Sequence, residues 1–331
     1  MKQSRRQFVR TLFIASEAAI ASRFLPVNLL AESLPPDART RALNFVVIGD
    51  WGRRGENDQQ DVSLQMGKTA HDIGARFIIS VGDNFYEDGV SSVDDVQWHE
   101  SFEDVYTTPS LQVPWYVILG NHDYHWNCDA QIEYSKKSPR WTMPARYYQQ
   151  SHQIDKDTTA DFFYLDTTPM LKIYYNPLFE ENTEAQVKTQ NVPGQIAWFK
   201  AALAASKAQW KIVIGHHPIY SGGEHGDSHE LIKNILPLIQ EYGVQAYFCG
   251  HDHDLQHLMA GDINLFISGA GSQVRPTFKT SHTKFAKASS GITAVSLASD
   301  AMDIRMIDDK GTLLYTTRVL RNSVSAQPVP A

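Results

Sequence analysis

Metal-binding side chains follow five short apolar runs of the chain, and each time a glycine separates the run from the side chain. The five places are Gly49-Asp50, Gly82-Asp83, Gly120-Asn121-His122-Asp123, Gly215-His216 and Gly250-His251. Tyr86 and His253 follow two of these places and add a phenol and a further imidazole. Carboxylate, phenolate, amide and imidazole groups together make a suitable ligand set for two metal ions.

Each place has a simpler interpretation when it is taken alone. An aspartate after a strand is often part of a turn, and a single histidine is more often a hydrogen-bonded structural residue than a ligand. Five such places in succession favour a metal site, because independent turns would not supply compatible donors every time. One carboxylate can bridge two cations about 3.5–4 Å apart, an arrangement that serves phosphate ester hydrolysis.

Strands and helices must alternate to position these residues. The apolar runs are rich in β-branched and aromatic residues, which predicts buried strands. Three intervening segments have the apolar spacing of helices, at residues 62–73, 196–203 and 231–242. Alternating strands and helices form parallel β-α-β units, whose carboxyl ends meet at one edge of a sheet. We therefore expect the motifs to converge there.

After Gly250 the pattern changes to alternating strands without helices. We expect strands at residues 263–268, 291–297, 302–307 and 313–319, with Asp308-Asp309-Lys310-Gly311 as the hairpin turn between the last two. This pattern predicts a second, largely antiparallel sheet packed on the first. No linker or repeat interrupts the chain, which indicates one domain over residues 32–322.

Three further features complete the organisation of the chain. Residues 176–193 lack periodicity, which predicts a surface loop, and residues 323–331 are expected to form a disordered tail. Two cysteines, Cys128 and Cys249, are too few for a disulfide scaffold and leave either one bridge or two free thiols. The net charge of -7 argues against a nucleic-acid partner, so any attraction for phosphate must be local.

Residues 1–31 differ from the rest of the chain, because basic residues precede a modest apolar stretch. This is typical of an export signal. The pair Arg5-Arg6, followed one residue later by Phe8, resembles the twin-arginine motif. We expect the twin-arginine export machinery as a partner and a periplasmic or secreted location, with a basic surface helix as the alternative. No stretch approaches the ~20 apolar residues that span a bilayer, so we expect no stable membrane insertion.

Together the five motifs resemble those of the calcineurin-like metallophosphoesterases. Tyr86, three residues after Asp83, narrows the resemblance to the purple acid phosphatases of the mammalian-like, tartrate-resistant type. The resemblance covers roughly residues 44–257. It implies an α/β fold in which two packed mixed β-sheets are flanked by helices, a four-layer α/β/β/α sandwich.

The resemblance also implies two metals, Fe(III) and a divalent Fe, Zn or Mn ion. The ligands of Fe(III) would be Asp50, Tyr86 and His253. Asp83 would bridge the metals, and the divalent ion would be held by Asn121, His216 and His251. A phenol with a pKa of about 10 becomes a ligand at low pH only beside a strong Lewis acid, which agrees with Fe(III).

Histidines complete the expected site. By resemblance, His122 and His225 are the catalytic residues at the substrate mouth, and together with Asn121 they bind the substrate. Asp123 either orients His122 or belongs to a structural turn. His217 directly follows a ligand on an extended chain, so we expect it to point elsewhere and to pack or support the ligands.

The resemblance implies an acid phosphatase that acts on small phosphorylated substrates, with a metal-bound hydroxide attacking the phosphate monoester. A phosphodiesterase or nucleotidase on the same metal core is one alternative. A secreted binding protein that has lost turnover is another. Tyr86 argues against the first alternative, and the complete ligand set with His122 and His225 argues against the second.

Overall fold

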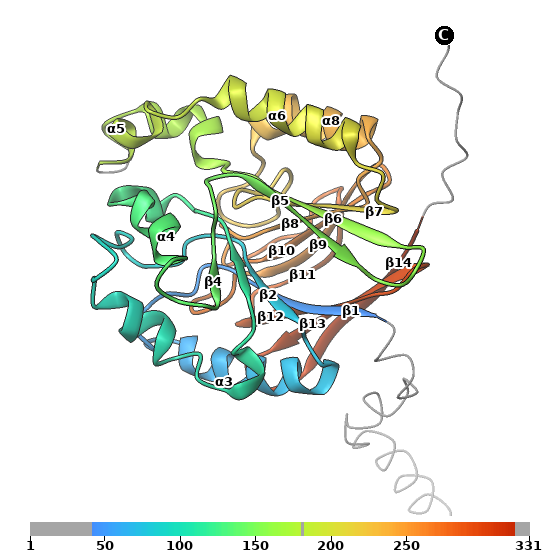
Figure 1. Cartoon of the computed structure of the whole chain (residues 1–331), viewed down its shortest axis with the longest axis horizontal. Coiled ribbons are helices and arrows are strands. Elements are labelled where there is room, and N and C mark those ends of the chain that lie inside the picture. Colours follow the sequence, from blue (N-terminus) through green and yellow to red (C-terminus); the bar gives the residue numbers. More distant parts are fainter. Residues whose placement is uncertain (1–41, 180–181, 322–331) are drawn as a thin grey trace, which may run out of the picture. The chain divides into compact units, whose positions relative to one another are not determined.

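The computed structural model of the protein describes residues 42–179 and 182–321. The predicted export signal at residues 1–31 and the predicted tail at residues 323–331 lie outside this part. The described residues form two seven-stranded mixed sheets, with helices on their outer sides (Figure 1). The predicted four-layer α/β/β/α architecture is thereby confirmed.

The first sheet joins strands from both ends of the described chain. Its members are β1 (Leu43–Ile48), β2 (Phe77–Ser80), β3 (Trp115–Val117), β4 (Trp141–Thr142), β12 (Gly291–Leu297), β13 (Ala301–Asp308) and β14 (Leu313–Leu320). They run in the order β14-β13-β12-β1-β2-β3-β4. From β1 to β4 the neighbours are parallel, and from β1 outward to β14 they are antiparallel.

The second sheet comes from the middle of the chain. Its members are β5 (Tyr148–Gln153), β6 (Thr159–Tyr164), β7 (Trp210–Ile214), β8 (Ala246–Cys249), β9 (Leu255–Ala260), β10 (Ile263–Ser268) and β11 (Thr283–Lys287). They run in the order β11-β9-β10-β8-β7-β6-β5. The neighbours from β6 to β10 are parallel, so the ends of β7 and β8 that carry His216 and His251 face the same way.

Helices connect the strands. The α-helices are α3 (Gln59–Ile73), α4 (Cys128–Tyr134), α5 (Thr183–Val187), α6 (Val192–Ala205), α7 (His229–Asn234) and α8 (Leu236–Glu241). Other helical turns are η2 (Trp98–Glu103), η3 (Pro109–Leu111), η4 (His122–His125), η5 (Thr168–Met170) and η6 (Lys172–Tyr175). Helix α3 covers one outer side, while α6 and α8 cover the other (Figure 1).

Alternating residues of each strand divide between two cores. In β1, Phe45 and Val47 belong to the core between the sheets, whereas Val46 and Ile48 pack with the helices. The ring of Phe45 lies 5.5 Å from Phe162 of β6 in an edge-to-face contact. Both faces of the strand are buried, which explains the continuous apolar runs in the sequence.

One prediction from the sequence was wrong. The strands after Gly250 do not form their own antiparallel sheet, because β9, β10 and β11 extend the second sheet and β12, β13 and β14 extend the first. The predicted strands are present, but β10 pairs with β8 and β12 pairs with β1. Without these partners, the edges of β8 and β1 would expose unpaired backbone groups. The hairpin turn between β13 and β14 is confirmed, with Gly311 at a φ of 85°.

Two local predictions also need correction. Residues 176–193 are not a simple loop, because α5 lies within this segment with Thr183 and Val187 buried, and α6 starts at Val192. The helix predicted at 231–242 is divided into α7 and α8 at Ile235, just before Pro237. Proline cannot supply the backbone hydrogen bond that a continuous helix needs.

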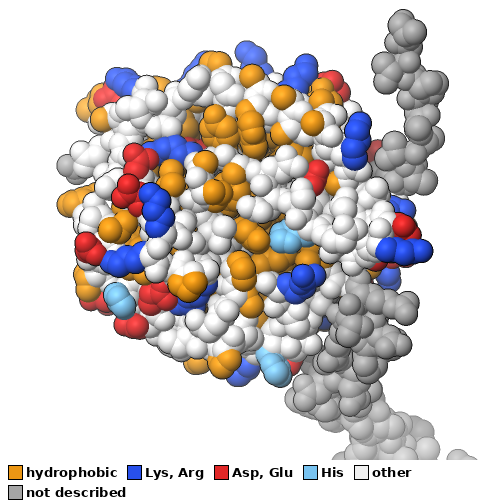
Figure 2. Space-filling model, viewed as in Figure 1, with side chains coloured by type: hydrophobic (Ala, Val, Ile, Leu, Met, Phe, Trp, Pro, Cys, Tyr) orange, Lys and Arg blue, Asp and Glu red, His pale blue; other side chains and the backbone are white. Residues whose placement is uncertain are grey.

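Other sequence features are located as follows. Cys128 and Cys249 are buried free thiols, so the alternative without a bridge holds. Within residues 42–179 and 182–321, no helix has the length and hydropathy required for a membrane span. On the face shown in Figure 2, basic and acidic side chains are interspersed, and hydrophobic side chains gather toward the middle.

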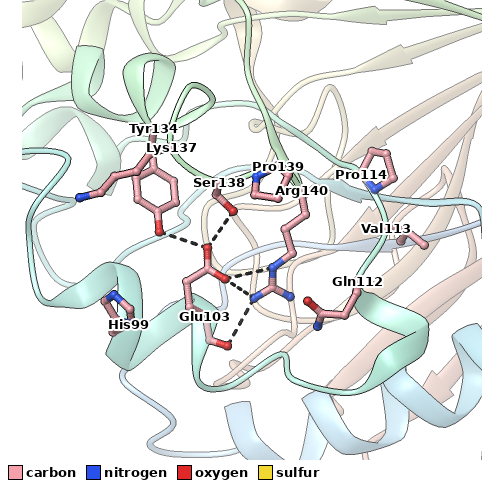
Figure 3. Close-up of a pocket in the computed structure, with 10 residues that line it drawn as sticks. All are labelled: His99, Glu103, Gln112, Val113, Pro114, Tyr134, Lys137, Ser138, Pro139 and Arg140. Atoms are coloured by element: carbon pink, nitrogen blue, oxygen red, sulfur yellow. Dashed lines mark hydrogen bonds and ion pairs between the residues drawn. The ribbon is translucent and has the colours of Figure 1, made fainter.

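A nearly buried ion pair joins η2 to the segment before β4 (Figure 3). Arg140 Nη2 lies 2.7 Å from Glu103 Oε2, and Arg140 Nη1 donates to the carbonyl of Tyr106 at 2.7 Å. The other oxygen of Glu103 accepts hydrogen bonds from Tyr134 and Ser138. These two side chains line a surface cavity of about 480 Å³, but their polar groups are occupied with one another and with the backbone.

We expect Arg140→Met to lower the free energy of unfolding by about 3 kcal/mol, because it leaves the Glu103 carboxylate without its cation. Lys137→Met is the matched control on the same cavity. Lys137 pairs with Asp94 at the surface, so its loss should cost less than about 1 kcal/mol. Urea unfolding of both variants under identical metal loading measures the difference, and equal midpoints would contradict this role of the ion pair.

Candidate metal centre

The sequence motifs meet at the carboxyl ends of parallel strands from both sheets. Asp50 and Asp83 follow β1 and β2 of the first sheet, and Asn121 lies beyond β3. His216 and His251 follow β7 and β8 of the second sheet. The polar residues after both sheets therefore collect in one place, as the alternation of strands and helices predicted.

Asp83 lies between two groups of donors. Its Oδ2 lies 2.9 Å from the Tyr86 hydroxyl, and its Oδ1 lies 3.5 Å from Nε2 of His216. Its Oδ1 also accepts a hydrogen bond from the backbone N–H of His122 at 2.9 Å. Since the two oxygens face different donor groups, this carboxylate has the placement that a bridging ligand requires.

The first donor group consists of Asp50, Tyr86 and His253. The Tyr86 hydroxyl lies 3.2 Å from Asp50 Oδ1 and 3.1 Å from His253 Nε2. His253 Nε2 lies 3.5 Å from Asp50 Oδ1. A carboxylate, a phenol and an imidazole thus face one another beside Oδ2 of Asp83.

The second donor group consists of Asn121, His216 and His251. Nε2 of His216 lies 3.1 Å from Oδ1 of Asn121, and the rings of His216 and His251 are 5.1 Å apart between centroids. Candidate ligand atoms of His216 and His251 lie within 4.8 Å of one another, as do those of Asp50, Asp83 and His216. The seven predicted ligands are therefore together, although their roles as ligands remain a prediction.

Burial shifts the pKa values of this cluster. It raises the pKa of Asp50 well above the ordinary value, because the charged form loses its hydration. It also raises the pKa of Tyr86 strongly, and the neighbouring Asp50 and Asp83 add to the effect. Burial lowers the pKa of His253 to about 3 and that of His251 well below its ordinary value. The imidazoles of His251 and His253 are therefore neutral and able to bind a metal.

Asp83 and His216 behave as a charged pair. Burial alone would raise the pKa of Asp83, but His216 and His122 lower it well below the ordinary value. Burial would likewise lower the pKa of His216, yet Asp83 raises it to about 9. Two buried acidic residues and a phenol, together with the neutral imidazoles of His251 and His253, make a donor set that suits two metal cations.

Strained backbone places three of these residues. Asp50, Asp83 and His251 have φ angles of 59°, 50° and 70°, in the left-handed region that non-glycine residues rarely adopt. Such strain collects at functional sites, where surrounding structure fixes it. Glycines before two of the candidate ligands, Asn121 and His251, are required by space, since a Cβ on Gly120 would lie 2.1 Å from Asp83 Oδ1 and one on Gly250 would lie 2.2 Å from Asp50 Oδ2.

The two predicted catalytic histidines lie on either side of the cluster. The His122 ring is 4.5 Å from that of Tyr86 between centroids, and its Nδ1 lies 2.5 Å from the carbonyl oxygen of Glu87. The His225 ring is 4.1 Å from that of His251. Both residues are thus adjacent to the candidate ligands.

The Asp123 carboxylate accepts hydrogen bonds from backbone N–H groups and does not orient the His122 ring. Its Oδ2 accepts from the N–H of Gly120 at 2.9 Å, and both its oxygens lie 3.1 Å from the N–H of Asn84. Gln131 Nε2 donates to its Oδ1 at 2.7 Å. Asp123 therefore ties the loop of Asp83 to the loop of Asn121.

His217 supports the ligands, as predicted. Its Nδ1 lies 2.9 Å from the Thr167 hydroxyl and its Nε2 lies 2.7 Å from the Tyr174 hydroxyl. Both ring nitrogens are thus engaged by hydroxyl groups, and the ring lies against the second donor group, with its centroid 4.4 Å from that of His251 and a candidate ligand atom within 4.8 Å of those of His216 and His251. Burial keeps the pKa of His217 well below its ordinary value, so the ring remains neutral.

Three residues near the cluster were missed in the sequence. The guanidinium of Arg53 lies 3.7 Å above the ring of Tyr86 and pairs with Glu87 at 2.5 Å. Arg275 Nη1 lies 2.8 Å from Nε2 of His225. Asp252 accepts from the backbone N–H of His225 at 2.9 Å. The spacing of residues in the sequence does not reveal these contacts. The one available signal was that Arg53 lies three residues after Asp50.

We expect Asp123→Asn to reduce metal affinity by about 10- to 100-fold, because an amide N–H would face the donors of Gly120 or Asn84. Retained metal after dialysis against graded chelator concentrations measures this. The control is Asp129→Asn, which changes an exposed carboxylate paired with Arg146. Equal metal retention in the two variants would show that Asp123 does not hold the site.

Comparison with known proteins agrees with this geometry. Residues 43–255 match the model of the calcineurin-like phosphoesterase family. Human tartrate-resistant acid phosphatase type 5 is 35% identical over 313 residues, which cover 89% of this chain and 96% of the relative. Purple acid phosphatase 17 of Arabidopsis thaliana is 40% identical over 258 residues, which cover 74% of this chain and 72% of the relative.

Among solved structures, GAP50 of Plasmodium aligns with a TM-score of 0.75 and 24% identity, over 85% of this chain and 89% of that chain. At this identity the likeness concerns the fold alone. The family match and the sequence identity to the curated relatives are more specific. The chain belongs to the calcineurin-like phosphoesterase family and, within it, to the purple acid phosphatases.

Proposed function

We propose that this protein is an acid phosphatase that hydrolyses phosphate monoesters at a dinuclear metal centre. The observation that carries the proposal is the position of Asp83, whose two carboxylate oxygens face two separate donor groups. Membership of the purple acid phosphatases supports the same conclusion. Small phosphorylated molecules are the corresponding substrates.

We assign the first donor group, Asp50, Tyr86 and His253, to Fe(III), and Asp83 to the bridge. Asn121, His216 and His251 would hold a divalent Fe, Zn or Mn ion. When bound, the two ions supply an activated nucleophile from water and neutralise charge on the phosphoryl oxygens. Arg53 favours the phenolate form of Tyr86, because a cation over the ring stabilises a negative oxygen.

His122 and His225 have different capacities in this arrangement. The Arg275 guanidinium has only hydrogen-bond donors, so its Nη1–H donates to Nε2 of His225. Nε2 therefore carries no proton, and the proton of the ring is on Nδ1. His225 is then neutral and can donate to a phosphoryl oxygen through Nδ1. His122 donates through Nδ1 to the Glu87 carbonyl, which leaves Nε2 available to carry the proton for the leaving alkoxide. We therefore propose His122 as the general acid and His225 as a substrate-binding residue, with Asn121 beside them.

A phosphodiesterase or nucleotidase on the same core is the second candidate, because these donors fix the reaction centre and not the leaving group. Tyr86 and the identity to acid phosphatases favour the monoesterase. Comparing p-nitrophenyl phosphate with bis(p-nitrophenyl) phosphate on one metal-loaded preparation separates the two. Faster turnover of the diester, with an optimum near neutral pH, would favour the second candidate.

We expect the iron-loaded protein to absorb visible light through charge transfer from the Tyr86 phenolate, and Tyr86→Phe to abolish this band. Tyr315→Phe, which alters a tyrosine on β14, is the matched control and should keep the band. Phosphatase activity of the wild type should be highest below neutral pH and should disappear after chelation. An unchanged spectrum in Tyr86→Phe would refute the assignment of the ferric site.

We further propose that residues 1–31 direct export by the twin-arginine machinery to the periplasm or the medium, which rests on Arg5, Arg6 and Phe8. Replacing both arginines by lysine keeps the charge, so a merely basic segment would still function. In a bacterial host, we expect this double variant to keep phosphatase activity in the cytoplasm, whereas the wild type delivers it to the periplasm. Equal periplasmic activity would contradict the proposal.

A further inference from the structure

A buried chain of hydrogen bonds lies close to the metal centre without including any of the candidate ligands. Its central groups are the side chains of Tyr124 and Asp166, which are 0% and 1% exposed. The Tyr124 hydroxyl donates to Oδ2 of Asp166, and Nη1 of Arg146 donates to the Tyr124 oxygen at 3.1 Å. Nη2 of Arg146 pairs with Asp129 at 2.7 Å. The Tyr124 hydroxyl is therefore held between a cation and a carboxylate.

The hydrogen bond between Tyr124 and Asp166 joins segments that follow strands of different sheets. Tyr124 lies in η4, which begins with His122 and comes after β3 of the first sheet. Asp166 comes directly after β6 of the second sheet. Because β6 and β7 are parallel, Asp166 and His216 follow strand ends that face the same way. The position of η4 relative to the second sheet is thus set by a direct contact between side chains.

The backbone around Asp166 is tied to the second donor group. The N–H of Asp166 donates to Oε1 of Gln195 at 2.8 Å, and Nε2 of Gln195 donates to the carbonyl oxygen of Asp166 at 3.0 Å. The hydroxyl oxygen of the next residue, Thr167, accepts from the backbone N–H groups of His216 and His217 at 3.2 Å each. Asp166 is therefore an anchor whose position is fixed relative to the ligand His216.

The placement of His122 depends on the turn that carries it. Its side chain is 21% exposed, and Nδ1 meets the carbonyl oxygen of Glu87, whose own side chain is 66% exposed. The N–H of Tyr124 donates to the carbonyl oxygen of Asn121 at 3.0 Å, so a shift of Tyr124 would move the turn that contains His122. A displacement of about 1 Å can lower a reaction rate by about 100-fold.

We propose that Tyr124 and Asp166 are positioning residues, which hold η4 against the second donor group so that Nε2 of His122 meets the leaving oxygen. The inference rests on the proposed function, with His122 as the general acid. In the reaction the bond between phosphorus and the leaving oxygen breaks, an oxygen from water bonds to phosphorus, and a proton passes from Nε2 of His122 to the leaving oxygen. Tyr124 and Asp166 exchange no proton with the substrate and act through the position of His122.

Two substrates that differ in their need for a proton separate the placement of His122 from general support of the fold. p-Nitrophenolate leaves as a stabilised anion, whereas ethoxide must be protonated as it leaves. In the metal-loaded full chain, we expect Tyr124→Phe to lower kcat/KM for ethyl phosphate by about 10- to 100-fold and that for p-nitrophenyl phosphate by less than about threefold. The metal content per chain should remain that of the wild type.

The matched control is Tyr134→Phe, because Tyr134 is also a buried tyrosine whose hydroxyl donates to a carboxylate, that of Glu103 at 3.1 Å, but it lies on α4. This variant should leave the ratio of the two kcat/KM values unchanged. Should Tyr124→Phe fail to fold, the double variant Tyr124→Phe/Asp166→Asn removes the buried charge that would be left without its donor. We expect the same selective loss for ethyl phosphate from the double variant.

The outcomes distinguish the positioning role from the proposed function. An equal loss for both substrates in Tyr124→Phe, or a loss of bound metal, would overturn the positioning role. His122→Ala is measured in parallel, and an equal loss for both substrates in that variant would overturn the assignment of His122 as the general acid. Absence of metal-dependent phosphatase activity in the wild type would overturn the proposed function itself.

Discussion

The burial of two carboxylates at the meeting point of the sheets is the constraint on which this structure depends. Asp50 is 0% exposed and Asp83 is 1% exposed. Among the described residues, no lysine or arginine pairs with either carboxylate: Asp83 pairs with His216, and Asp50 lies beside the neutral ring of His253. Two such charges in a nonpolar interior would repel one another, and cations held between them relieve that cost.

The rest of the fold serves to keep these donors in place. Parallel strands of both sheets end at the centre, and glycines allow the backbones to approach where a Cβ would collide with a carboxylate. The left-handed conformations of Asp50, Asp83 and His251 cost about 1 kcal/mol or more each. The strands that carry these residues are anchored in the close-packed apolar core between the sheets, where Phe45 packs against Phe162 and Phe248.

Sequence periodicity predicted the strands and the convergence of the ligands, because burial on both faces and the glycine before each donor are local signals. It failed after Gly250, where the pairing of β12 with β1 joins residues far apart in the chain. It also could not decide the function of Asp123, whose partners Asn84 and Gly120 lie in two different loops. The contacts of Arg53 with Tyr86 and of Arg275 with His225 depend on side-chain positions in the folded protein, which the spacing of residues in the sequence does not predict.

The attraction of an acidic protein for phosphate follows from this arrangement. The arginines nearest the centre do not supply free positive charge, since Arg53 pairs with Glu87 at 2.5 Å and Arg275 Nη1 lies 3.7 Å from Glu224. The net charge of -7 adds long-range repulsion. Local attraction must therefore come from the cations that Asp50, Asp83 and Tyr86 would hold. The charge that binds the substrate would thus be the same charge that compensates the buried carboxylates, which couples stability of the site to its activity.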